Sequence, residues 1–120
     1  HRRIATSSCN TTRTMYNPIT NQSSTMVNFA SNDYLNLSQH PDVISAAIRA
    51  LQEFGAGPGS PSNFAGHSIV KENLENEIAQ TFGYERALVF SSGYSTNVGV
   101  LRALLRSNDV AIVDMLAHAS

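Results

Sequence analysis

The sequence lacks tryptophan, has one cysteine and one lysine, and carries little charge of either sign. The lone cysteine, Cys9, excludes an internal disulfide framework and is typical of a reducing compartment, so we expect a cytoplasmic protein. The net charge of −1 comes from interleaved charges, which excludes the basic patch that nucleic acid or an anionic membrane surface requires. No apolar run is long enough to span a membrane.

Apolar residues nevertheless make up 42% of the 120 residues and recur in periodic blocks, which indicates a buried core. Residues 1–25 are polar, and the turn chemistry of Asn17-Pro18 predicts a leader or extended arm there, without packed structure. A short half-buried strand is expected at residues 26–30. We therefore predict an arm over residues 1–25 and, over residues 26–120, the N-terminal part of an incomplete domain.

Two amphipathic helices are expected in the middle of the chain. The first begins at Pro41, because the N–H that proline lacks would have no acceptor within the helix at the first helical position, and it ends at Gly55. The second follows the N-cap Ser68 and ends at Gly83. The expected apolar faces are Ile44, Ala47, Ile48, Leu51 and Phe54 on the first helix, and Val70, Leu74, Ile78 and Phe82 on the second. The side chains expected on the solvated side of the second helix are those of Glu72, Glu75 and Glu77.

The last third of the chain predicts a strand, a helix and a second strand. Residues 87–90 and 110–113 are unbroken apolar runs, typical of strands that are covered on both faces. A helix from Tyr94 separates them, so the two strands should pair in parallel through a right-handed crossover. The predicted fold class is α/β.

Ligands of open parallel sheets bind beyond the carboxyl ends of the strands, and two such ends are predicted here. Small residues at 91–93 lead into the helix at Tyr94, and the free N–H groups and dipole of a helix start suit a phosphate. Any junction between a strand and a helix needs small residues, so this turn is also explained without a ligand. At the other strand end, the ring of His118 is suitably placed to stack on an aromatic cofactor.

Other kinds of site are not indicated. The glycine-rich segment 55–59 follows a helix and lacks the spacing and the Gly-Lys-Ser/Thr ending of nucleotide-binding loops. The histidines at positions 1, 40, 67 and 118 have no metal-ligand spacing, so we expect no metal site. Ser92 lies in no nucleophile elbow, so serine-nucleophile hydrolysis is not expected.

Five blocks of the sequence carry a family resemblance, in order and spacing, from about residue 28 to the end. They are Ser31-Asn32-Asp33-Tyr34-Leu35-Asn36-Leu37 with His40-Pro41, the glycine loop 55–59, Leu74-Glu75 with Glu77-Ile78-Ala79, Phe90-Ser91-Ser92-Gly93-Tyr94-Ser95-Thr96-Asn97, and Asp114 to Ser120. Together they resemble the α-oxoamine synthases, a family of acyltransferases that depend on pyridoxal 5'-phosphate (PLP).

The resemblance implies the type I PLP-dependent transferase fold, related to aspartate aminotransferase, of which this chain would be the N-terminal arm and the start of the large domain. Members condense a small amino acid with an acyl-CoA or another acyl thioester, and release CO₂, CoA and an α-aminoketone. They work as dimers with the active site at the subunit interface, and we expect a homodimer here. The lysine that binds PLP in the family is expected downstream, so these 120 residues alone should be inactive.

The resemblance also assigns roles to single residues. His118 corresponds to a catalytic histidine that stacks on the PLP ring, and Gly93 and Tyr94 correspond to the turn that holds the PLP phosphate. Asn32 corresponds to an asparagine that contacts the carboxylate of the amino acid, although a turn-forming role would also explain it. Asn63 lies where some members contact the acyl substrate.

The chain departs from the family pattern at three places. Asn36 replaces a glycine, which a residue tolerant of the left-handed conformation can do. The loop 58–63 lacks the common Gly-Gly-Ser-Arg pattern, so we expect an unusual acyl group or an unusual carrier. Lys71 stands where histidine is frequent, and we expect it on the solvated surface, not as the PLP lysine.

Two other functions stay open at this point. A catalytically empty subunit could support an active partner, as in eukaryotic serine palmitoyltransferase, but such a subunit has no need of His118 or Gly93. Another type I PLP enzyme, such as an aldolase or a sulfur-amino-acid lyase, is disfavoured by the opening at residues 32–35. The sequence does not indicate which amino acid or acyl donor is used.

Overall fold

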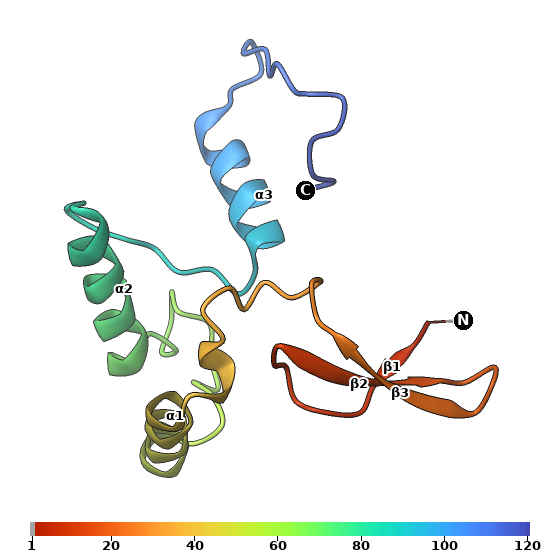
Figure 1. The fold of residues 1–120 in the computed structure, drawn as a ribbon. Helices are drawn as coiled ribbons and strands as arrows, with labels where there is room; N and C mark the ends of the chain where they lie inside the picture. The colour runs from red at the N-terminus through yellow and green to blue at the C-terminus, as the bar shows by residue number, and fades with distance from the viewer. Residues whose placement is uncertain (1) are drawn as a thin grey trace. The chain divides into compact units, whose positions relative to one another are not determined.

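The computed structural model describes residues 2–120, which form two units, one ending at Gly57 and the other beginning at Pro58. The elements are β1 (Ile4–Ala5), β2 (Thr12–Asn17), β3 (Gln22–Val27), the 3₁₀ turn η1 (Leu37–Gln39), α1 (Pro41–Phe54), α2 (Ile69–Phe82) and α3 (Gly93–Leu104) (Figure 1). No helix in this part of the chain has both the length and the apolar character needed to cross a bilayer.

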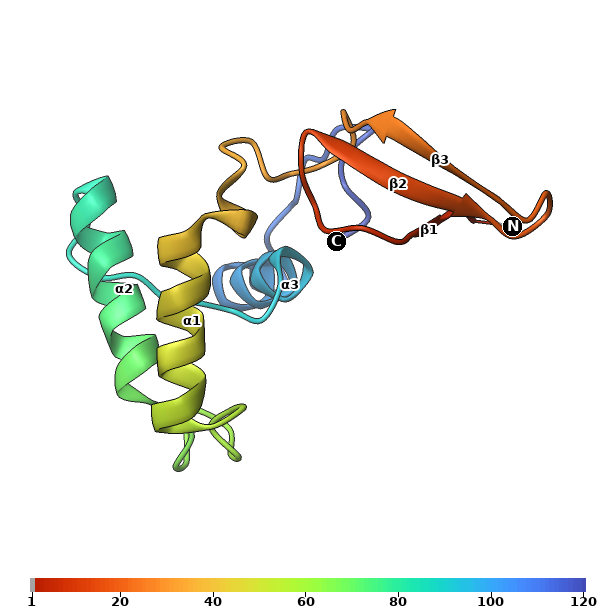
Figure 2. The same ribbon diagram turned by 60° about the horizontal axis from the view of Figure 1, so that its bottom comes forward.

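The first unit contains an antiparallel sheet in the order β1-β2-β3, whose strands run side by side in both ribbon views (Figures 1 and 2). The hairpin of β2 and β3 pairs Thr12 with Val27 and Asn17 with Gln22. Residues 18–21 form its turn, as the Asn17-Pro18 signal predicts, and Asn21 takes a left-handed φ of 54° there. The polar segment is thus extended as predicted, but its strands are hydrogen-bonded to one another instead of remaining unpacked.

Helix α1 begins and ends as predicted. His40 is the N-cap, and its ring accepts a hydrogen bond from the Asp42 N–H at 3.3 Å. Pro41 occupies the first turn, and Gly55 ends the helix with a φ of 80°. The predicted apolar face is present, but its large side chains remain exposed in this structure.

Helix α2 also has the predicted ends, while its buried face is not the predicted one. The Ser68 hydroxyl accepts the Lys71 N–H at 3.3 Å, and Gly83 ends the helix in the left-handed conformation. The buried residues of α2 are Glu75 and Ala79, whereas Leu74 is exposed. The placement of Glu75 on the solvated side was wrong, because its carboxylate has a partner in a later segment that helical periodicity does not reveal.

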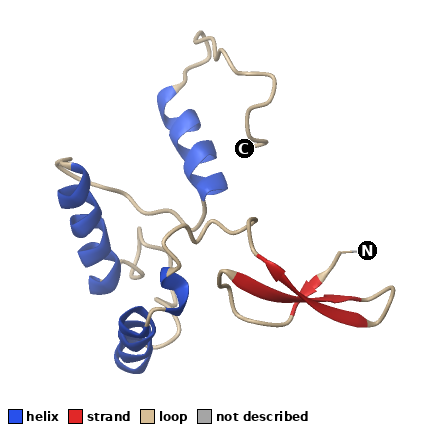
Figure 3. Ribbon diagram, in the orientation of Figure 1, coloured by secondary structure: helices blue, strands red, loops and turns tan. Residues whose placement is uncertain are grey.

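The two apolar runs that predict a parallel pair of strands are loops in this structure (Figure 3). Neither 87–90 nor 110–113 pairs with another strand among residues 2–120, and Leu88 and Ile112 are 68% and 97% exposed. A strand needs the N–H and C=O groups of a neighbour, so high apolar content alone does not make one. The predicted parallel pair is thus absent from residues 2–120. The structure does combine helices with a sheet, as the predicted α/β class requires, but the sheet is antiparallel. The strand predicted at 26–30 overlaps β3 only at Met26 and Val27.

Candidate functional site

The start of α3 is the first candidate binding element of the second unit. Ser92 is the N-cap: its hydroxyl accepts the Ser95 N–H at 3.1 Å, and its carbonyl accepts the Thr96 N–H at 3.0 Å. Among residues 2–120, no hydrogen bond uses the N–H groups of Gly93 and Tyr94. These two donors and the positive end of the helix dipole suit an anion.

A chain of hydrogen bonds connects α3 to His118. The Asn97 amide donates to the Ser120 hydroxyl at 2.8 Å, and that hydroxyl lies 2.7 Å from Nδ1 of His118. The Ser120 backbone N–H also points to Nδ1, at 3.1 Å. Because a backbone N–H can only donate, Nδ1 is an acceptor and the ring proton of neutral His118 lies on Nε2.

This chain brings two predicted regions together. Gly93 and Tyr94 lie about one helical turn before Asn97, and Asn97 is tied through Ser120 to the segment that carries His118. Sequence reasoning did not foresee that Ser120 fixes the ring, although Ser120 closes the same sequence block as His118.

Asn63 is not joined to these residues by any hydrogen bond within residues 2–120. Asn63 is exposed in the loop before α2. Hydrogen bonds of other residues hold this loop in place. The Lys71 ammonium donates to the Ser62 hydroxyl at 3.2 Å, and the Gly66 N–H donates to the Pro61 carbonyl at 3.0 Å. Gly66 must be glycine here, since a Cβ would lie 1.7 Å from the carbonyl oxygen of Ser60.

A buried carboxylate lies between α2 and the segment before α3. The Glu75 carboxylate accepts the Val89 N–H at 2.8 Å and lies 3.6 Å from the Lys71 ammonium. The Lys71 side chain is 25% exposed, so it lies half-buried at the surface, where it pairs with Glu75. The spacing of Lys71 and Glu75 by four residues was the available sequence signal for this pair.

His67 and Glu72 form a second pair at the start of α2. Nε2 of His67 contacts the Glu72 carboxylate, and this hydrogen bond holds the pKa of Glu72 below its ordinary value. The ligating atoms of His67, Glu72 and Glu75 all lie within 4.8 Å of one another. The Lys71 ammonium already compensates Glu75, which weighs against a cation site at this cluster.

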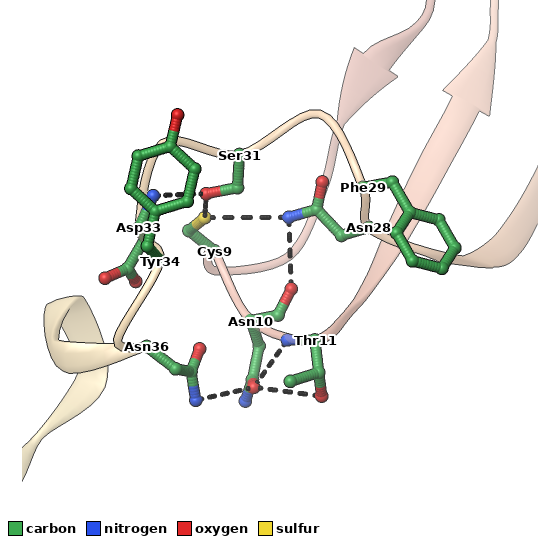
Figure 4. A pocket seen from close by; sticks show the side chains of 9 residues that line it. All are labelled: Cys9, Asn10, Thr11, Asn28, Phe29, Ser31, Asp33, Tyr34 and Asn36. Atoms are coloured by element: carbon green, nitrogen blue, oxygen red, sulfur yellow. Dashed lines mark hydrogen bonds between the residues drawn. The ribbon is translucent and has the colours of Figure 1, made fainter.

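The first unit has its own pocket, of about 270 Å³, where the turn between β1 and β2 meets the loop after β3 (Figure 4). Its lining consists of Cys9, Asn10, Thr11, Asn28, Phe29, Ser31, Asp33, Tyr34 and Asn36. The Asn28 amide donates to the Asn10 carbonyl at 3.0 Å, and Sγ of Cys9 lies 3.1 Å from the Ser31 hydroxyl. These bonds join the loop to the sheet.

The loop that carries Asn32 is ordered by Asp33. The Asp33 carboxylate accepts the Leu37 N–H at 2.9 Å and the hydroxyl and N–H of Ser38. The Ser38 hydroxyl is the main reason why the pKa of Asp33 lies below its ordinary value. Asn36 adopts a φ of 53°, so the left-handed conformation inferred at this position is confirmed. Asn32 itself is exposed, and its side-chain oxygen lies 3.5 Å from the Tyr34 hydroxyl.

Comparison with known proteins agrees with the motif pattern. The model of the family described as aminotransferase class I and II matches residues 24–120. Proteins named 8-amino-7-oxononanoate synthase from Salmonella schwarzengrund (strain CVM19633), Salmonella agona (strain SL483) and Salmonella typhi are each 48% identical to the chain over 94 residues. The match covers 78% of this chain and 24% of each relative, so the chain spans about a quarter of the length of these curated relatives. The chain belongs to the aminotransferase class I and II family, and within it to the α-oxoamine synthases.

Proposed function

We propose that the protein containing this chain is a PLP-dependent synthase that condenses a small amino acid with an acyl-CoA and releases CO₂, CoA and an α-aminoketone. The observation that carries the proposal is the link from Asn97 through Ser120 to His118, which ties a stacking ring to the helix whose start suits a phosphate. The relatives are named 8-amino-7-oxononanoate synthase, and a nine-carbon acid with an amino group at C8 and an oxo group at C7 is the product expected from alanine and a seven-carbon dicarboxylic acyl thioester after loss of CO₂. These are therefore the first substrates to test.

The residues at the start of α3 fit the PLP phosphate. The first turn of α3 has no acidic residue, so nothing there repels a dianion. Apart from its chain neighbours and its own helix backbone, no heavy atom lies within 4 Å of the position that a Cβ of Gly93 would take, so this side of the turn is open. In this proposal Gly93 and Tyr94 donate to the phosphate.

His118 would orient the cofactor through its flat face. With its proton held on Nε2 and Nδ1 occupied by Ser120, the ring is fixed in one tautomer and keeps Nε2–H as a donor. When bound, PLP supplies an electron sink for negative charge at the α-carbon of the amino acid. The protein's part is to hold the cofactor flat against His118, and to shield one of its faces from water.

Substrate contacts are assigned to two asparagines. Asn32 would donate its amide N–H to the carboxylate of the amino acid, since a neutral amide satisfies a carboxylate without adding a charge. The hydrogen bonds of Asp33 hold the loop on which Asn32 stands. Asn63 would contact the acyl substrate. We further propose a homodimer, with its active site at the subunit interface and its PLP lysine outside these 120 residues.

The test is PLP binding to the full-length protein, followed by acyl-CoA-dependent CO₂ release with glycine, alanine and serine. We expect the visible absorbance of protein-bound PLP, and a loss of PLP affinity when His118 is replaced by alanine. Absence of the absorbance, together with no effect of His118→Ala, would contradict the proposal. The alternative of a catalytically empty subunit has no observation in its favour.

A further inference from the structure

Glu75 is the one charged side chain in the second unit that is buried, with 8% of its surface exposed. Most large apolar side chains of the same unit are exposed. A carboxylate is costly to remove from water unless hydrogen bonds and an opposite charge compensate it. The burial of Glu75 therefore requires such partners.

Both kinds of compensation are present. The Val89 N–H donates to Oε1 of Glu75 at 2.8 Å, and the Lys71 ammonium lies 3.6 Å from the same oxygen. A hydrogen bond from an amide to a charged carboxylate is stronger than one to a neutral acceptor. Glu75 thus replaces, for Val89, the carbonyl group that a neighbouring strand would offer.

Val89 stands immediately before the turn that leads into α3, and the next residue is held as well. The ring of Phe90 packs against α3 at Gly99, where an added Cβ would come within 3.0 Å of Cε1. The segment before Ser91 is therefore anchored to α2 through Val89 and to α3 through Phe90. These are contacts of a segment that belongs to no strand in this structure (Figure 3).

We infer that Glu75 is a positioning residue for the phosphate-binding turn: its carboxylate fixes Val89, and thereby sets where the N–H groups of Gly93 and Tyr94 point. The inference rests on the proposed function, because it assigns to this turn the PLP phosphate. Glu75 touches neither cofactor nor substrate in this role. The ligand that reports on it is a phosphate monoester held at the start of α3.

The decisive variant in the full-length protein is Glu75→Asp. It keeps the charge that compensates Lys71, but shortens the side chain by about 1.5 Å, so its oxygen no longer reaches the Val89 N–H. The matched control is Glu77→Asp, the same change at an exposed position of α2. Titration with PLP, followed by its absorbance, gives the dissociation constant, and the ³¹P resonance of bound PLP reports on the phosphate itself.

We expect Glu75→Asp to weaken PLP binding about tenfold and to shift the ³¹P resonance. Glu77→Asp should stay within about twofold of the wild type with an unshifted resonance, and Glu75→Gln, which keeps an oxygen within reach of Val89, should recover most of the affinity. Equal affinity and equal resonances for Glu75→Asp and Glu77→Asp would overturn the positioning role while leaving the proposed function intact. A wild-type protein that binds no PLP would overturn both.

Discussion

Different kinds of interaction stabilise the two units of the chain, each within itself. In the first unit the main-chain groups of β2 and β3 pair over their full length, from Thr12 with Val27 to Asn17 with Gln22. In the second unit the loops depend on single side chains, such as Glu75 on Val89 and Ser120 on His118. Strand pairing tolerates side-chain replacement, whereas a side-chain hydrogen bond is lost with one substitution.

The contrast is sharper because the paired strands are polar and the unpaired runs are apolar. Strand β3 is Gln-Ser-Ser-Thr-Met-Val, whereas residues 110–113 are Val-Ala-Ile-Val, the better strand former by composition. The hairpin forms because its partner is a short turn away in sequence, which makes closing the loop inexpensive in entropy. Within residues 2–120 the polar strands pair because each has a partner close in sequence, and the apolar runs remain unpaired because no strand lies beside them.

The largest effect is expected from proline in the central strand. Met15 pairs with Ala5 on one side and Ser24 on the other, so Met15→Pro removes a donor from the sheet and should destabilise the first unit by at least about 2 kcal/mol. Ile112→Pro is the control in an unpaired run. Amide hydrogen exchange measures the effect of both substitutions. If Ile112→Pro removed protection from the amides of residues 110–113, this run would be paired in solution, contrary to the structure.

A clash in the second unit should come next in size. Gly66→Ala places a Cβ 1.7 Å from the Ser60 carbonyl oxygen, so the loop must shift, at a cost of about 1–3 kcal/mol. Gly57→Ala meets no atom within 4 Å and should be neutral or slightly stabilising. Chemical denaturation of the two variants gives the difference. Equal stabilities would mean that the loop after α1 does not hold the described conformation.

Loss of the Ser120 hydroxyl should have a smaller effect, confined to His118. Ser120→Ala removes the hydroxyl between Asn97 and Nδ1, a hydrogen bond worth about 1 kcal/mol, so PLP affinity should fall about fivefold. Ser107→Ala, at an exposed serine, is the control. The ¹⁵N shifts of the His118 ring report the tautomer, and an unchanged Nε2–H fraction in Ser120→Ala would assign its fixation to the backbone N–H alone.

Sequence reasoning succeeded where the determining interactions are local. The caps at Ser68 and Gly83 were predictable because their partners lie within one turn of the helix. Glu75 was misplaced because its partner, Val89, lies fourteen residues away and contributes a backbone N–H, which has no sequence signature. The pairing of β2 with β3 was missed because these strands lack the alternation of apolar and polar residues that marks a half-buried strand.

The candidate site shows the same division. The start of α3 was predicted to within one residue, since small residues before a helix are a local signal. The hydrogen-bond chain from Asn97 to His118 was not predicted, because its first bond joins Asn97 to Ser120, 23 positions further along the sequence. Motif resemblance identified His118 itself, but only the structure shows that Ser120 holds the Nδ1 atom of the ring.

The smallest expected effect, a pH dependence, compares one carboxylate from each unit. The pKa values of Asp33 and Glu72 are both lowered, Asp33 mainly by the Ser38 hydroxyl and Glu72 mainly by His67. A lowered pKa in the folded state stabilises the fold at pH values above the unfolded pKa, and this stabilisation is lost as the pH falls through the folded pKa, here on the acid side of the ordinary pKa values of aspartate and glutamate.

Asp33 keeps the N–H groups of Leu37 and Ser38 as donors when the Ser38 hydroxyl is removed, whereas the causes that lower the pKa of Glu72 are all side chains. We therefore expect Ser38→Ala to raise the pKa of Asp33 only in part, and His67→Ala to raise that of Glu72 by the larger share of its shift. Titration of the two carboxyl groups by ¹³C NMR measures this. A full return of Asp33 to its ordinary pKa in Ser38→Ala would mean that backbone donors contribute nothing in the first unit, and the contrast between the units would fail at this site.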